Sequence, residues 1–67
     1  MMKVIGNATV GNEQQMLNLC ECAKIVGADV YIKGNTVYAE FEGNDEQGEL
    51  LADIFRQYPF HGISILS

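Results

Sequence analysis

Residues 29–42 read DVYIKGNTVYAEFE, and this stretch decides the fold. Polar and apolar residues alternate on both sides of Gly34-Asn35, a pattern typical of two strands that each bury one face. A two-residue connection that begins with glycine indicates a tight hairpin, because glycine adopts positive φ without strain. The stretch therefore predicts an antiparallel hairpin of strands 29–33 and 36–42. Its inner face should carry Val30, Ile32, Val37, Ala39 and Phe41.

The residues before the hairpin predict a strand and then a helix. Alternation over residues 3–10 places Val4, Ala8 and Val10 on one side of a strand. Asn12 and Gln15 have the spacing of a capping box, and Gly27 suits the end of a helix. Between them, apolar residues recur at helical spacing: Met16, Leu19, Cys20, Ala23 and Val26. We expect a helix over about residues 12–26.

The residues after the hairpin repeat this plan. Asn44 and Gln47 have the same capping spacing, and Asp45 and Glu46 suit the positive end of a helix dipole. The apolar stripe of this second helix is Leu51, Ile54, Phe55 and Tyr58, and Pro59 ends it. Ile63 and Ile65 then face inward on a last strand, which His61 begins.

The two halves match at an offset of 32 residues, which places Gly11-Asn12 on Gly43-Asn44 and Leu19 on Leu51. The order is β-α-β-β-α-β within a single domain, residues 1–67. Right-handed crossovers then predict both helices on one face of a four-stranded antiparallel sheet of order 4-1-3-2. This α+β pattern resembles the ferredoxin-like fold, which hosts many unrelated functions and implies no activity. The expected core is Val4, Leu19, Ala23, Val30, Ile32, Val37, Phe41, Leu51, Phe55 and Ile63.

The charge balance bears on the kind of partner. Nine acids against four bases give a formal net charge of −5. This opposes direct binding to nucleic acid or to an anionic membrane, and it favours either a partner protein with a basic surface or simply solubility. The sequence lacks the apolar run of about 20 residues that would span a bilayer, and Asn7 and Asn12 interrupt any signal-peptide core. We expect a cytoplasmic protein with reduced cysteines.

The residue types that support catalysis or metal binding are poorly placed for it. Cys20 and Cys22 are two apart on a helix and point about 200° from each other, so they should not share a metal ion. We expect Cys20 in the core and Cys22 at its edge. His61 lies far from both thiols, and its ring should bond to a backbone carbonyl. The dispersed glycines form no phosphate loop. The sequence therefore predicts no enzyme, no cofactor and no metal.

An acidic run and an aromatic pair are the strongest binding features. Six of the nine acids lie between residues 40 and 53. Glu40 and Glu42 share one side of their strand, about 6.6 Å apart. Across the turn Tyr31 should pair with Tyr38, and Asp29 should oppose Glu40, a costly like-charge pair unless something compensates. Of the bases, only Lys33 is expected near this face, which argues against RNA. The candidate partner-binding residues are Tyr31, Tyr38, Glu40, Glu42, Asp45, Glu46 and Glu49.

These residues predict a small protein-binding domain. A row of carboxylates can imitate a phosphate backbone to a protein built to hold nucleic acid. In this respect the chain is similar in kind to anti-CRISPR proteins, which are short, acidic phage inhibitors. The acidic run is alternatively a solvated helix start. A second hypothesis is a dimeric regulatory domain like the amino-acid-binding domains of this fold, with ligand near Val10-Gly11-Asn12. Leu17 and Ile25 should be exposed on the first helix, where a homodimer or partner contact is possible.

Overall fold

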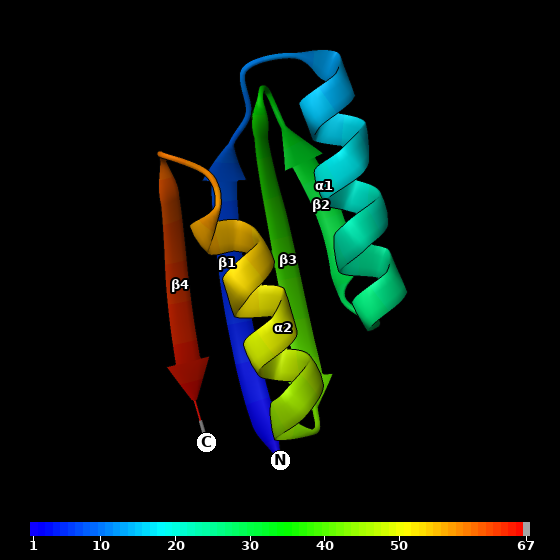
Figure 1. The fold of residues 1–67 in the computed structure, drawn as a ribbon, viewed down its shortest axis with the longest axis vertical. Coiled ribbons are helices and arrows are strands. Elements are labelled where there is room, and N and C mark those ends of the chain that lie inside the picture. Colours follow the sequence, from blue (N-terminus) through cyan, green and yellow to red (C-terminus); the bar gives the residue numbers. More distant parts are fainter. Residues whose placement is uncertain (67) are drawn as a thin grey trace.

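Both helices lie on one face of the sheet in the computed structural model, which describes residues 1–66 (Figure 1). The elements are β1 (Met2–Thr9), α1 (Glu13–Val26), β2 (Asp29–Lys33), β3 (Thr36–Gly43), α2 (Asp45–Arg56) and β4 (His61–Leu66). The strands pair antiparallel in the order β2-β3-β1-β4. This confirms the ferredoxin-like α+β fold, with the sheet order predicted from the two matched halves.

The predicted helix caps form at both N-termini. The Asn12 side-chain oxygen accepts a hydrogen bond from the Gln15 amide at 2.9 Å, and that of Asn44 accepts one from the Gln47 amide at 2.8 Å. The Gln15 side-chain oxygen in turn accepts a hydrogen bond from the amide of Gly11 at 2.7 Å. In this first cap the glutamine therefore bonds the amide of the residue before Asn12, whereas in a capping box it bonds the amide of the N-cap residue itself. These bonds satisfy backbone donors that the helices leave unpaired.

Two glycines have the positive φ that the sequence pattern required. Gly34 begins the hairpin turn with a φ of 62°, and Gly27 ends α1 with a φ of 107°. At the end of α1 the amide of Ala28 donates to the carbonyl of Ala23 at 3.0 Å, which closes the last turn. Both positions suit glycine because a Cβ strains this conformation.

The core lies between the helices and the two central strands, β1 and β3. Its largest fully buried side chains are Phe55, Leu19, Leu51, Val4 and Val37. Gly6 of β1 lies directly under the Phe55 ring, since a Cβ at Gly6 would be 3.1 Å from Phe55 Cδ2. The absent side chain therefore lets α2 approach the sheet. Leu19 and Leu51, which match in the internal repeat, are buried at equivalent places.

The edge strands bury less than the sequence predicted. Ile32 of β2, expected in the core, is 49% exposed, and Val30 and Ile63 are only partly buried. Ile65 of β4 lies on the helix-covered face, as predicted, but is 37% exposed. The prediction for Ile32 was wrong because an edge strand has a neighbour on one side only, so the helices cover its inner face incompletely.

Candidate functional site

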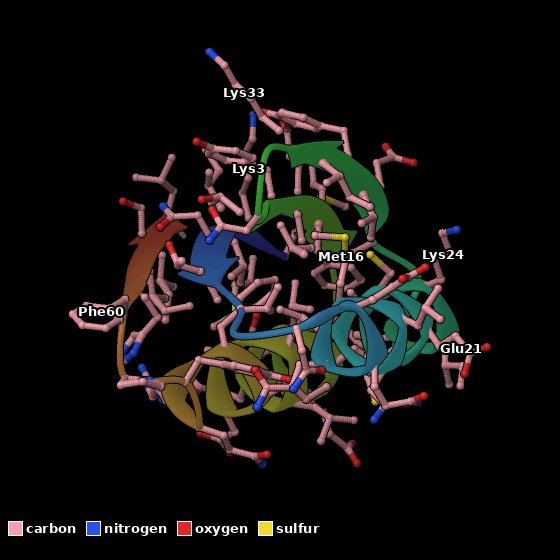
Figure 2. The ribbon with its side chains drawn as sticks, turned by 90° about the horizontal axis from the view of Figure 1, so that it is seen from above. Lys3, Met16, Glu21, Lys24, Lys33 and Phe60 are labelled. Carbon is pink, nitrogen blue, oxygen red and sulfur yellow. The ribbon has the colours of Figure 1, made fainter. Side chains whose placement is uncertain are left out.

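The face of the sheet without helices holds most of the predicted binding residues. Residues directly opposite each other in an antiparallel pair share a face, so the register defines this helix-free face. Figure 2 shows Lys3 and Lys33 on the side of the sheet away from both helices. The helix-free face carries Lys3, Ile5, Asn7 and Thr9 of β1, Asp29, Tyr31 and Lys33 of β2, Thr36, Tyr38, Glu40 and Glu42 of β3, and Gly62, Ser64 and Leu66 of β4.

Tyr31 and Tyr38 form a stacked aromatic pair on this face. Their ring centroids are 4.9 Å apart and the ring planes differ by 8°. This confirms the pairing predicted across the Gly34-Asn35 turn. Tyr31 is 61% exposed, so the pair offers an aromatic surface to a partner. Because the rings hold each other, little side-chain freedom is left to lose on binding, which favours an aromatic contact.

Lys3 explains how the sheet tolerates Asp29 opposite Glu40. The register confirms that like-charge pair. From the neighbouring strand β1, Lys3 Nζ lies 3.3 Å from Glu40 Oε1. Both partners are well exposed, so the ion pair stabilises the fold by only about 0–1 kcal/mol. Its main effect is to offset the repulsion and to fix the Glu40 carboxylate on the face.

The acidic run divides between two sides of the molecule. Glu40 and Glu42 lie on the helix-free face, whereas Asp45, Glu46 and Glu49 belong to α2, which covers the opposite face. The groups are joined only around the turn between β3 and α2. The acidic run therefore bends around the end of β3 and does not lie on one face of the sheet.

The helix-free face is less acidic than the chain as a whole. It carries three acids, Asp29, Glu40 and Glu42, against two bases, so its formal charge is −1 of the chain's −5. Lys33 was expected on this face, whereas Lys3 was not. The signal was present, since alternation along the first strand places Lys3 on the same side as Ile5. Ile5, 41% exposed, adds an apolar contact beside Glu40.

The cysteines and the histidine lie away from this face. Cys20 is buried and Cys22 is exposed. The His61 ring donates through Nδ1 to the carbonyl of Tyr58, as the sequence predicted. Burial raises the pKa of the Tyr58 hydroxyl above its ordinary value, and the nearby Cys22 thiol raises it further. Within residues 1–66, no three His, Cys, Asp or Glu side chains are grouped to hold a metal ion.

Two hollows flank the loop between β1 and α1, where the alternative hypothesis places a ligand. The larger has a volume of about 400 Å³ and lies between this loop and the loop that follows α2. Its lining comprises Thr9, Val10, Gly11, Gln15, Gln57, Tyr58, Pro59 and Phe60. The smaller, of about 290 Å³, lies on the other side of the loop, towards Met16 and Asn35.

In the described part of the chain, neither helix is long and apolar enough to cross a membrane.

Fold and site together define a small ferredoxin-like α+β domain with an open, partly aromatic sheet face. Comparisons of the sequence with protein-family models and with curated proteins find no match.

Proposed function

We propose that the chain is a non-enzymatic protein-binding domain whose contact surface is the helix-free face. The observation that carries the proposal is the exposed stack of Tyr31 on Tyr38, on a sheet face that neither helix covers. Tyrosines are enriched among the residues that dominate binding energy at protein interfaces. Along β3 the side chains of Tyr38, Glu40 and Glu42 follow one another down this face. We call this series, with Tyr31, the β3 strip.

The charge of the β3 strip favours a partner with a basic surface. Lys3 offsets Glu40, so the acidic end of the strip is at Glu42, which makes no ion pair within residues 1–66. Beyond it the chain turns into α2, where Asp45 adds a carboxylate. A basic groove on a partner has the charge that complements these carboxylates. In its narrower form, the proposal makes the domain an inhibitor of the phage type, which occupies a nucleic-acid-binding groove.

The divided acidic run supplies a matched experiment. One variant reverses Glu40 and Glu42 to Lys, and its control reverses Glu46 and Glu49 to Lys on α2. Each changes the formal net charge from −5 to −1, because every Glu→Lys change adds two charges. Each variant and the wild-type chain are used to capture protein from host lysate at low and at high salt. We expect capture to be lost with the Glu40/Glu42 variant, retained with the control, and weakened by salt in the wild type.

Two outcomes contradict the proposal. Equal capture by all three chains means that the carboxylates of the β3 strip only aid solubility. If capture is lost with the control variant alone, the contact surface lies on α2. Circular dichroism of each variant checks the fold. We expect it to persist because both glutamates are exposed and a lysine at position 40 gains Asp29 as an opposite charge, although Lys3 then faces like charges at positions 40 and 42.

The hollow beside the β1–α1 loop favours a second candidate, a regulatory domain that binds a small ligand. Its volume of about 400 Å³ is of the size that binds small molecules. A panel of proteinogenic amino acids, tested by thermal unfolding, checks this candidate directly. A binder should raise the unfolding temperature in proportion to the logarithm of its concentration, and Gln57→Ala should reduce that effect. A panel without any effect removes amino acids as the ligand class.

A further inference from the structure

The two edges of the sheet differ in how they are protected. Natural sheets guard an exposed edge with charged side chains, with proline or with a covering helix. β2 carries Asp29 and Lys33 at its two ends, and α1 lies over it (Figure 1). α2 packs against the inner face of β4, but neither α1 nor α2 lies beyond its outer edge in the same view. Residues 57–66 contain no Asp, Glu, Lys or Arg, in a chain that has thirteen such residues. β4 is therefore the edge strand that has no charged side chain to oppose pairing with another strand.

Apolar side chains are also exposed at this edge, beside the polar His61 and Ser64. Ile65 is 37% exposed and Leu66 is 55% exposed. Phe60, directly before the strand, is 72% exposed and points outward at this edge of the molecule (Figure 2). Apolar side chains gathered along an unpaired strand are typical of a surface that another strand covers.

The backbone hydrogen bonds determine which groups of β4 are free to pair. The Thr9 amide donates to the Phe60 carbonyl at 2.9 Å, so Phe60 turns its backbone groups towards β1. Hydrogen-bonding direction alternates along an antiparallel strand. The amides and carbonyls of Gly62, Ser64 and Leu66 therefore face β1, and those of Ile63 and Ile65 face outward.

We infer that β4 pairs antiparallel with β4 of a second copy of this chain, about a two-fold axis at Ser64. In this register Ile63 lies opposite Ile65 of the second copy, so their outward amides and carbonyls meet and their side chains pack together. On the other face, Leu66 lies opposite Gly62, which has no side chain to oppose it. The contact is the same patch on both chains, as a two-fold interface requires.

A second copy fits this edge because the strand is self-complementary. Two chains of net charge −5 repel each other, and the uncharged β4 edge is the place where their strands meet without opposed like charges. Paired in this way, both helix-free faces lie on the same side of one continuous sheet. The dimer goes beyond the proposed function, since it would present two β3 strips and bind a partner with two equivalent sites more tightly.

Ser64 gives a charge-swap test, because its exposed side chain lies on the helix-free face opposite its own copy. Sedimentation velocity over a range of concentrations should give twice the 7.4 kDa of one chain for the wild type. Ser64→Lys and Ser64→Glu should each be monomeric, because like charges then face each other across the axis. An equimolar mixture of the two variants should restore the dimer.

A control on α1 separates this dimer from other assemblies. Leu17→Lys places the same charge on an exposed apolar residue of the helix and should leave the dimer intact. A monomeric wild type at every concentration overturns the inference. Dissociation by Leu17→Lys but not by Ser64→Lys assigns the contact to α1 and also overturns it. So does a mixture that remains monomeric while each variant keeps its circular dichroism spectrum.

Discussion

The two faces of the sheet are built from alternate residues of the same strands, yet they have opposite characters. On β3, Val37, Ala39 and Phe41 are buried under the helices, whereas Tyr38 and Glu40 between them lie on the open face. The covered face is apolar except for His61 at the start of β4, and it closes the core. The open face mixes an aromatic pair, carboxylates and lysines. Neighbouring positions on one strand therefore separate the residues that stabilise the fold from those that we propose contact a partner.

The largest effect expected from this comparison is on the covered face. Phe55→Ala removes a fully buried ring that packs on Gly6, and it should lower the free energy of unfolding by about 3–5 kcal/mol. A domain of this size has little stability to spare, so much of this variant should be unfolded. Denaturant titration followed by circular dichroism measures the loss.

Tyr31→Ala is the matched change on the open face. It also removes an aromatic ring, but that ring is 61% exposed, so the loss of stability should be far smaller than for Phe55→Ala. Equal losses from the two variants would mean that the faces do not divide stability from binding.

A small effect on stability, with a larger one on binding, is expected for Tyr38→Ala. The change breaks the stack with Tyr31 and should cost about 1 kcal/mol of folding stability. Affinity for a captured partner should fall about tenfold or more, as for other aromatic residues at the centre of an interface. Calorimetric titration of the two folded proteins measures that ratio. An unchanged affinity would remove the tyrosine pair from the contact surface.

Most of the fold could be predicted from the sequence because its local signals agree. Gly34-Asn35 marks the hairpin, and Asn12 and Asn44 mark the helix starts with the same spacing to a glutamine. The offset of 32 residues then pairs the two halves, and chain connectivity leaves few topologies. The Tyr31–Tyr38 pair followed from the hairpin register alone.

The remaining features depend on the tertiary arrangement, which the alternation of polar and apolar residues along one strand does not reveal. Ile32 has the pattern of a core residue, but its strand lies at the edge of the sheet. Lys3 compensates Glu40 only because β1 is the neighbour of β3, and the two residues are far apart in sequence. The acidic run is continuous in sequence, but in the structure it passes from the helix-free face around the end of β3 to α2. All three features, namely the exposure of Ile32, the Lys3–Glu40 ion pair and the path of the acidic run, depend on which strands are neighbours and on where the helices cover them.

The central claim is that a partner contacts the helix-free face, and site-specific photo-cross-linking tests it most directly. Benzoylphenylalanine is incorporated at the position of Tyr31 on the open face or of Leu50 on α2, side chains that are 61% and 54% exposed. Each labelled chain is mixed with the captured partner and irradiated, and the cross-linked product is quantified on a gel. The account predicts a strong cross-link from position 31 and little from position 50. A stronger cross-link from position 50, or none from position 31 while the complex still forms, would contradict it.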